Sequence, residues 1–400
     1  MASGFVPSVP TISAVLKASR MFLEGLPYEK PETVSGFEDG RWRNESRNTP
    51  ILVYDFFSGC GGTSEGLRKA GMKPVMGLDI DHEAMATYAR NFKGAEAVHR
   101  NVCDLATSDL EHLFERERTS PVLFSACAPC QPFSRQNRQR KEQDSRISLL
   151  AELGRFVRRF RPELIFIENV PGLQAFSEAE DGPLARLFEL LDACGYSHTC
   201  QTVEAQAYGV PQNRRRLVVV ASLYGLFTFP DPTHGPDAGM EPLLTVRNAI
   251  GHLPSIEAGM SDISVANHYA CSLSAKNLER IRAVSEGGDR RSWSDHLKLD
   301  CHVGLKGYTD VYGRMTWDKP SPSLTTRCVS LSNGRFGHPE QDRAISIREA
   351  ACIQSFPDEF EFLGSINAMA RQIGNAVPPR LAEAIGRALI AHVDHYRGMA

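Results

Sequence analysis

Short, continuous apolar runs recur between residues 51 and 221, and amphipathic segments separate them. Apolar runs of about four to eight residues are typical of parallel strands buried on both faces, whereas longer segments with a helical repeat are typical of helices. Strands that alternate with helices in this way predict an α/β fold built on a doubly wound parallel sheet. The predicted strands are 51–57, 75–78, 122–126, 164–167 and 217–221, and the predicted helices are 63–70, 83–92, 147–160 and 184–191.

The regions of the chain differ in composition and in their secondary-structure signals. Residues 1–47 are rich in Pro, Gly and charge, and we interpret them as an N-terminal extension with no assigned chemistry. Residues 48–229 carry the strand and helix signals, and residues 363–400 are expected to complete the same domain. Residues 230–362 begin with a long stretch rich in Pro, Gly, Ser and His, which predicts a second, smaller domain of less regular structure. A chain of 400 residues is long enough for both.

The composition argues against a membrane or secreted protein. No stretch approaches the roughly 20 apolar residues needed to span a membrane, and the N-terminal residues lack the pattern of a secretory signal. The ten cysteines are scattered, which in a chain of this size indicates reduced thiols and a cytoplasmic protein. A monomer is expected.

The net charge of −3 does not by itself indicate a nucleic-acid partner. Phosphate contacts need only a local basic surface, however, and two short segments could supply one. Residues 135–141 contain three arginines and a lysine, and residues 214–216 are all arginine. A solvated surface is the alternative interpretation of either run.

Cys127 and Cys130 form a C-x-x-C pair, which on its own would fit a redox pair or half of a zinc site. A zinc site needs a second pair of ligands at suitable spacing, and Cys194 and Cys200 are too far apart. We therefore predict no metal, and interpret Cys127 as a small buried hydrophobe.

A glycine-rich turn follows the first predicted strand, with the sequence Ser-Gly-Cys-Gly-Gly at 58–62. Ligands of open parallel sheets bind at the carboxyl ends of the strands, and glycines let the backbone approach a ligand closely. Asp79 ends the second strand and could accept hydrogen bonds from ribose hydroxyls, while Asp104 could accept one from an adenine amino group. The pattern predicts a nucleotide-like ligand, although tight packing, or the cofactor of a nicotinamide dehydrogenase, would also fit it.

Three further segments lie at or beside the carboxyl edge of the predicted sheet. They are Ala-Pro-Cys-Gln-Pro-Phe-Ser at 128–134, Glu-Asn-Val at 168–170 and Gln-Asn-Arg-Arg-Arg at 212–216. A dehydrogenase leaves the first and third of these unexplained. Near the C-terminus, Pro-Ser-Leu-Thr-Thr at 322–326 and Gln-Ile-Gly-Asn-Ala-Val-Pro at 372–378 complete an ordered set.

In this order the motifs resemble those of the cytosine-5 DNA methyltransferase family of bacterial or phage type. The resemblance covers nearly everything from residue 51 to the C-terminus. It implies a Rossmann-like sheet that uses S-adenosylmethionine, with residues 230–362 as a smaller target-recognition domain. The implied activity is transfer of a methyl group to carbon 5 of cytosine within a short double-stranded DNA sequence. A cognate restriction endonuclease that acts separately is a possible partner.

The resemblance implies four catalytic residues, whose types suit the chemistry. Carbon 5 of cytosine attacks a methyl group poorly until a thiolate adds at carbon 6, and Cys130 is the candidate thiol. Glu168 is expected to hold or share a proton at N3 if burial favours its protonated form. Arg216, and with it Arg214, is expected to bind the ring oxygen O2.

The resemblance also implies residues that hold the cofactor and the DNA. Ile80 stands where many family members have an aromatic residue against adenine, so we expect weaker stacking. The expected cofactor-binding residues are Phe57, Gly59, Gly61, Gly62, Asp79, Ile80, Asp104, Leu105, Pro129, Asn375 and Val377. The expected DNA-binding residues are Gln131, Ser134, Arg135, Gln136, Arg138 and Arg140.

The target base must leave the stacked duplex to reach such a site. We expect residues 134–141 to form a loop that closes on the DNA, with its arginines on phosphates. Within the variable part of the smaller domain, residues 287–291 and 308–314 are candidate groove or backbone elements.

Two alternative functions are left open by the sequence. One branch of the family methylates cytosine in transfer RNA, but its usual Cys-Phe-Thr segment is absent from this chain. A catalytically silent DNA-binding module is the other alternative, and the joint presence of Cys130, Glu168 and Arg216 argues against it.

Overall fold

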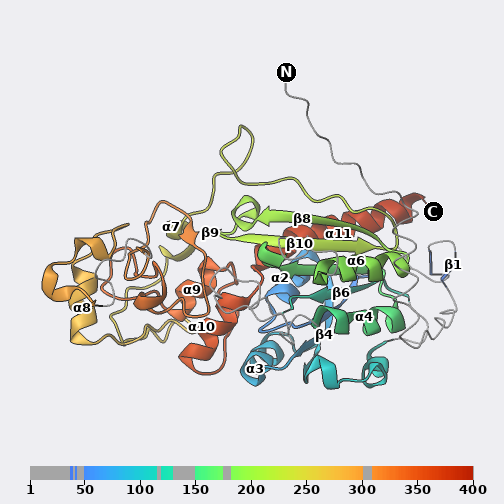
Figure 1. The fold of residues 1–400 in the computed structure, drawn as a ribbon, viewed down its shortest axis with the longest axis horizontal. Coiled ribbons are helices and arrows are strands. Elements are labelled where there is room, and N and C mark those ends of the chain that lie inside the picture. Colours follow the sequence, from blue (N-terminus) through green and yellow to red (C-terminus); the bar gives the residue numbers. More distant parts are fainter. Residues whose placement is uncertain are drawn as a thin grey trace.

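The computed structural model contains a seven-stranded sheet of order β5-β4-β3-β6-β7-β10-β8 (Figure 1). The structure describes residues 49–114, 119–128, 149–173, 182–300 and 309–399, together with the paired strands β1 (Phe37–Glu38) and β2 (Arg41–Trp42). The strands of the large sheet are β3 (Leu52–Phe56), β4 (Lys73–Asp79), β5 (Glu96–His99), β6 (Val122–Ala126), β7 (Leu164–Asn169), β8 (Ser197–Glu204) and β10 (Arg215–Ser222).

The sheet is mixed rather than wholly parallel, which corrects one expectation from the sequence. Strands β3 to β7 pair in parallel, but β10 runs antiparallel to both of its neighbours, β7 and β8. The apolar run at 217–221 identified β10 as a buried strand without revealing its direction. The edge strands β5 and β8 were missed because each is mostly exposed or half-buried and has no continuous apolar run.

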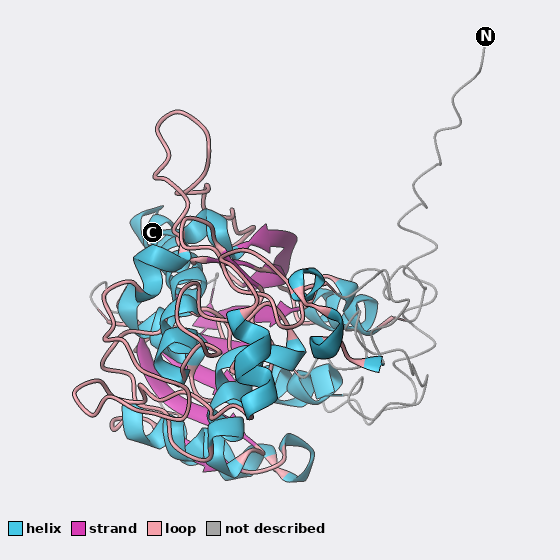
Figure 2. Ribbon diagram, turned by 90° about the vertical axis from the view of Figure 1, so that its left-hand side faces the viewer, coloured by secondary structure: helices cyan, strands magenta, loops and turns pink. Residues whose placement is uncertain are grey.

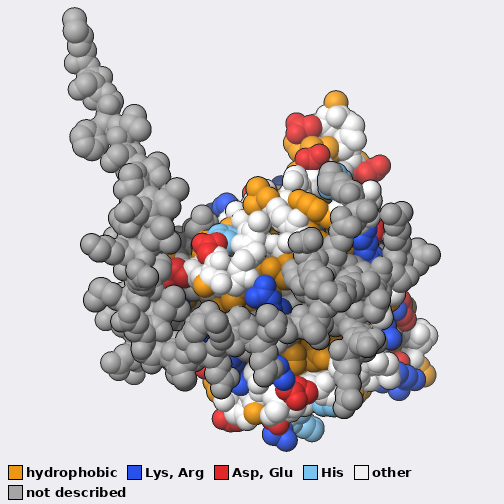
Figure 3. All heavy atoms as spheres, turned by 90° about the vertical axis from the view of Figure 1, so that its right-hand side faces the viewer, with side chains coloured by type: hydrophobic (Ala, Val, Ile, Leu, Met, Phe, Trp, Pro, Cys, Tyr) orange, Lys and Arg blue, Asp and Glu red, His pale blue; other side chains and the backbone are white. Residues whose placement is uncertain are grey.

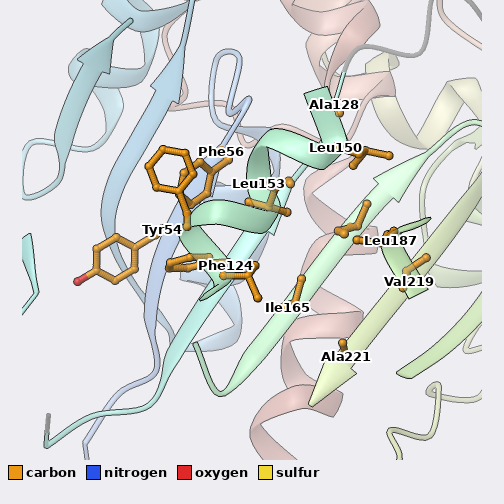
Figure 4. Close-up of a cluster of buried hydrophobic side chains, with 14 of the residues drawn as sticks. Tyr54, Phe56, Phe124, Ala128, Leu150, Leu153, Ile165, Leu187, Val219 and Ala221 are labelled. Atoms are coloured by element: carbon orange, nitrogen blue, oxygen red, sulfur yellow. The ribbon is translucent and has the colours of Figure 1, made fainter. Parts of the chain in front are cut away.

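Helices cover both faces of this sheet (Figure 2). One face packs against α4 (Leu149–Phe160) and α6 (Pro183–Ala193), and Figure 4 shows Leu153 of α4 beside Phe56 and Phe124 of the sheet. The other face packs against α2 (Gly62–Ala70) and the C-terminal helix α11 (Pro379–Met399). Because side chains alternate along a strand, Phe56 joins the first cluster and Val53 the second. Residues from the end of the chain therefore complete the sheet domain.

A less regular part of the molecule lies beside the sheet, at the left of Figure 1. The strand pair of β9 (Gln212–Asn213) with β11 (Ser321–Pro322) links the two parts. The remaining α-helices are α3 (His82–Asn91) beside the sheet, α7 (Val246–Ile250), α8 (Ala275–Arg282), α9 (Ile347–Ile353) and α10 (Ile366–Asn375). The 3-10 helices are η2 (Val102–Asp104), η3 (Thr107–Leu113), η6 (Ala205–Tyr208), η7 (Arg290–Ser292), η8 (Asp295–Leu297) and η10 (Leu331–Asn333).

The core of this second part contains a buried ion pair. Arg343 and Glu349 are almost fully buried, and two N–O distances of 2.7 Å join the guanidinium to the carboxylate. Ser346 accepts a hydrogen bond from the backbone N–H of Glu349 at the start of α9. The charges of Arg343 and Glu349 thus fix the approach of α9 to the rest of the core.

Within the described ranges, no helix combines the length and the apolar character needed to cross a membrane.

A buried carboxylate holds the centre of the sheet to two helices. Asp55 on β3 accepts hydrogen bonds from Ser125 Oγ on β6 at 2.6 Å and from Ser64 Oγ on α2 at 2.7 Å. The single Ser64 hydroxyl proton is engaged by Asp55, so the Tyr88 hydroxyl of α3 donates to Ser64 Oγ at 3.1 Å. Burial raises the pKa of Asp55 to about 6, because removal from water disfavours its charged form.

This buried acid predicts a pH-dependent loss of stability. The raised pKa means that the folded protein binds this proton more tightly than the unfolded chain does. The free energy of unfolding therefore falls as the pH rises to about 6. We expect the stability of the wild-type protein relative to Asp55→Asn to fall by about 1 kcal/mol between pH 5 and pH 7. Urea unfolding of both proteins across this range measures the difference. Asp237→Asn, at an exposed carboxylate, is the control, and a pH-independent difference for Asp55→Asn would contradict the prediction.

Candidate functional site

The glycine-rich turn between β3 and α2 wraps over the end of β4. Gly59 and Gly61 have φ angles of +54° and +98°, which side chains rarely permit, and Phe57 shares this left-handed conformation with φ 57°. Ser58 N–H donates to the Leu78 carbonyl at 3.0 Å, which ties the turn to the last residues of β4. A Cβ on Gly61 would lie 2.4 Å from the Phe92 ring, so the turn requires glycine at this position.

Asp79, at the end of β4, organises the same turn through its carboxylate. Oδ2 accepts from Gly59 N–H and Oδ1 accepts from Asp81 N–H, each at 2.9 Å. Burial raises the pKa of Asp79. Each carboxylate oxygen has two lone pairs, so both oxygens can accept a further hydrogen bond, such as one from a ribose hydroxyl.

The space beside this turn suits an adenosyl group. Among the described residues, no atom lies within 4 Å of a Cβ built on Gly59, so these residues leave open space beside its backbone. Ile80 is 67% exposed although it is a large apolar residue, and an aromatic ligand would cover it. Asp104 is exposed at the end of η2, and Leu105 is buried behind it. The chemistry of these groups therefore fits S-adenosylmethionine.

The C-terminal motif lies against the glycine turn. A Cβ on Gly62 would lie 2.4 Å from the Val377 carbonyl oxygen, so the two backbones are in close contact. Val377 is buried, whereas Asn375 is exposed at the end of α10. Gly374 packs equally closely on Thr325, because a Cβ on this glycine would lie 2.2 Å from the Thr325 carbonyl oxygen.

Arg214 joins these distant segments. Its Nη1 donates to the Leu324 carbonyl at 3.2 Å, and its Nη2 donates to the carbonyls of Gly374 and Ala376 at 3.1 and 3.2 Å. Gln212 supports it, since its Oε1 accepts from Leu324 N–H at 2.9 Å. The guanidinium therefore holds the chain after β11 and the end of α10 together.

This arrangement differs from the expectation that Arg214 contacts the cytosine ring. Arg214 is 2% exposed, and its terminal nitrogens are hydrogen-bonded to backbone carbonyls. Those bonds fix the backbone of the chain after β11 and of the end of α10, so Arg214 supports the site through its backbone contacts. Of the two arginines, it is Arg216 that reaches Glu168.

Glu168 and Arg216 form a buried ion pair at the carboxyl edge of the parallel strands. The Nε–Oε1 distance is 2.5 Å, and the side chains of Glu168 and Arg216 are only 4% and 14% exposed. The reversed direction of β10 creates the pair: Val218 lies opposite Glu168, and Arg216 is two residues earlier on the same face. If β10 ran parallel to β7, its first residues would lie at the opposite edge of the sheet.

Cys127 and Asn169 complete the surroundings of Glu168. Cys127 Sγ donates to Glu168 Oε2 at 3.0 Å, and Asn169 Nδ2 donates to the Ala128 carbonyl at 3.3 Å. Sequence reasoning treated Cys127 as a packing residue, because its contact with Glu168 depends on the register of two strands. It also missed the role of Asp55, although a lone acid within an apolar strand could have indicated one.

Several predicted site residues lie outside the part of the chain that the structure describes. These are Pro129, Cys130, Gln131, Ser134, Arg135, Gln136, Arg138 and Arg140. Their assignments stay predictions from the sequence.

The candidate groove elements of the second part differ in exposure. Arg291 is 75% exposed and pairs with Asp289 at 2.7 Å, so its guanidinium lies at the surface. Arg314 is 4% exposed and donates to the carbonyls of Val284, Ile281 and His338, so it is part of the core. Figure 3 shows the opposite end of the molecule, at the right of Figure 1, where basic and acidic side chains are interspersed over the described surface.

Comparison with known proteins identifies the family of this chain. The sequence pattern of the C-5 cytosine-specific DNA methylase family matches residues 51–391. The type II methylase M.HgiDII of Herpetosiphon aurantiacus is 36% identical over 84% of this chain and 94% of that protein. The type II methyltransferase M1.HphI of Haemophilus parahaemolyticus is 34% identical over 85% of this chain and 87% of that protein.

A solved structure extends the agreement to three dimensions. It is a protein encoded within an Escherichia coli prophage and assigned as a DNA modification methyltransferase, with 25% identity and a TM-score of 0.67. The match covers 86% of this chain and 99% of that chain. The family match spans the sheet, the Glu168–Arg216 pair and the C-terminal helices, and the chain therefore belongs to the C-5 cytosine-specific DNA methylase family.

Proposed function

We propose that this member of the family methylates carbon 5 of cytosine within a short double-stranded DNA sequence, with Cys130 as nucleophile. The observation that carries the proposal is the buried Glu168–Arg216 pair at 2.5 Å, placed at the same sheet edge as the glycine turn. An acid and a cation side by side suit a reaction in which charge develops on a ring whose edge faces both groups. The order of the motifs along the chain supports the same chemistry.

The family implies use of S-adenosylmethionine, which supplies an electrophilic methyl group. We assign the ribose hydroxyls to Asp79, the adenine face to Ile80 and the adenine amino group to Asp104. Phe57, Gly59, Gly61, Gly62, Leu105, Pro129, Asn375 and Val377 are proposed to form the rest of the binding surface. The open space at Gly59 and the exposure of Ile80 support this assignment.

The proposed reaction uses the protein groups in sequence. The target base is first extruded from the duplex. The Cys130 thiolate adds to carbon 6 while Glu168 and N3 share a proton and Arg216 binds O2, so that carbon 5 becomes nucleophilic. After carbon 5 takes the methyl group, a base removes its proton, and the bond between Cys130 and carbon 6 breaks to release the thiolate.

The remaining regions receive roles within the same proposal. Residues 48–229 with 363–400 form the catalytic domain, residues 230–362 recognise the target sequence, and 1–47 are an extension. Gln131, Ser134, Arg135, Gln136, Arg138 and Arg140 are proposed to contact DNA. The exposed guanidinium of Arg291 supports a DNA-facing role for its loop, because phosphates and guanines are both read by arginine.

Expression in a host that lacks cytosine methylation tests the function directly. Bisulfite sequencing of the host DNA is expected to reveal protected cytosines in one short motif with the intact protein and none with Cys130→Ala. Full conversion in both cases, with folded protein present, would contradict a DNA substrate. Transfer RNA would then be assayed with labelled S-adenosylmethionine, which tests the alternative of a tRNA cytosine-5 methyltransferase.

Replacement of Ile80 by tryptophan tests the cofactor site. Ile80 is 67% exposed, so a larger ring fits without repacking, and stacking on adenine is worth roughly 0.5–1.5 kcal/mol beyond area burial. We expect Ile80→Trp to tighten S-adenosylmethionine binding about two- to tenfold in calorimetric titration. Leu226→Trp is the matched control, because Leu226 is 65% exposed at a place remote in sequence. Equal affinities for both variants would place the adenine elsewhere.

A further inference from the structure

The carboxylate of Glu168 has a different neighbour at each oxygen. Oε1 lies 2.5 Å from Arg216 Nε, and Oε2 lies 3.0 Å from Cys127 Sγ. The Glu168 side chain is 4% exposed, so water cannot replace either neighbour freely. A buried carboxylate rotates unless both oxygens are restrained, and the angle of its plane decides where a proton can be delivered.

The register of the sheet places Cys127 next to Glu168. Strands β6 and β7 pair in parallel with Ala126 opposite Ile167. The residues that follow them, Cys127 and Glu168, are therefore also side by side. The Cys127 N–H donates to the Phe56 carbonyl at 3.4 Å, which fixes its backbone at the edge of β3. The position of the thiol therefore follows from the sheet itself.

The two oxygens of Glu168 are not equivalent. Among the described residues Oε1 receives no hydrogen bond of normal geometry, although the Arg216 guanidinium is close to it. Oε2 receives the hydrogen bond of the Cys127 thiol. Oε1 is therefore the oxygen with capacity to bind a ring nitrogen, and Oε2 is the oxygen by which the protein sets the orientation of the carboxylate.

We propose that Cys127 is a positioning residue for methyl transfer: its thiol holds Oε2 so that Oε1 faces N3 of the target cytosine. The inference rests on the proposed role of Glu168. This role differs from both earlier interpretations of Cys127, as a packing residue and as a member of a C-x-x-C pair. The thiol acts as a hydrogen-bond donor in this role, so a hydroxyl can replace it and a methyl group cannot.

Steady-state kinetics of four variants test the proposal with defined cytosine-containing duplex DNA and S-adenosylmethionine. Cys127→Ala removes the donor, and Cys127→Ser keeps one. Cys200→Ala is the matched control, because Cys200 is also a half-buried thiol of the sheet and lies on β8. Glu168→Gln reports whether Glu168 itself is required. Thermal unfolding of each variant monitors the fold.

We expect Cys127→Ala to lower kcat about tenfold, as loss of a hydrogen bond to a charged group does. The KM values for DNA and S-adenosylmethionine should stay within about twofold of the wild-type values, because Cys127 orients an acid rather than binding a substrate. Cys127→Ser is expected to restore kcat to within about threefold of wild type, and Cys200→Ala to leave it unchanged.

The other outcomes are distinguishable. If Glu168→Gln abolishes activity but Cys127→Ala retains wild-type kcat, the role of Cys127 is overturned and the proposed function stands. If Cys127→Ala and Cys127→Ser lose kcat equally, or raise both KM values, Cys127 acts through packing and the inference fails. Substantial activity in Glu168→Gln would instead refute the proposed function at its acid.

Discussion

The hydrogen bonds of the buried Arg214 guanidinium hold together segments that are far apart in the sequence. Arg214 precedes β10, yet it binds the carbonyls of Leu324, Gly374 and Ala376. A buried guanidinium that lost these acceptors would keep its charge without compensation, which is costly. The contact of the C-terminal motif with the glycine turn and the link to the second part of the molecule both depend on this one side chain.

The direction of β10 is the second constraint on the site. Five parallel strands bring the glycine turn, Asp79 and Glu168 to their carboxyl edge. The first residues of a strand lie at that same edge only if the strand runs antiparallel to these five. Because β10 is antiparallel to β7, Arg216 lies beside Glu168 at the start of its strand. Arg214 and Arg216 are two residues apart, so the same reversal positions both the arginine that binds backbone carbonyls and the arginine that pairs with Glu168.

The buried polar groups illustrate how geometry is maintained at a cost in stability. Asp55 lies in the middle of the sheet and is charged above about pH 6, where its burial is unfavourable. Its hydrogen bonds from Ser64 and Ser125 nevertheless align α2 with β3 and β6, and α2 begins in the glycine-rich turn. Exposed Ile80 is the complementary case, because an apolar surface left open is covered when a ligand binds.

The sequence by itself determined the strand and helix alternation, the glycine turn and the residue types at the carboxyl edge of the parallel strands. Apolar runs such as 122–126 reveal burial, because a strand buried on both faces needs no polar side. The sequence could not determine the direction of β10, since burial is the same for either direction, nor the polar edge strands. Tertiary structure alone decided that Arg214 binds backbone carbonyls while Arg216 meets Glu168, and that Cys127 donates to the same carboxylate. Such contacts depend on strand register and on which residues surround a side chain, and neither is encoded in local residue patterns.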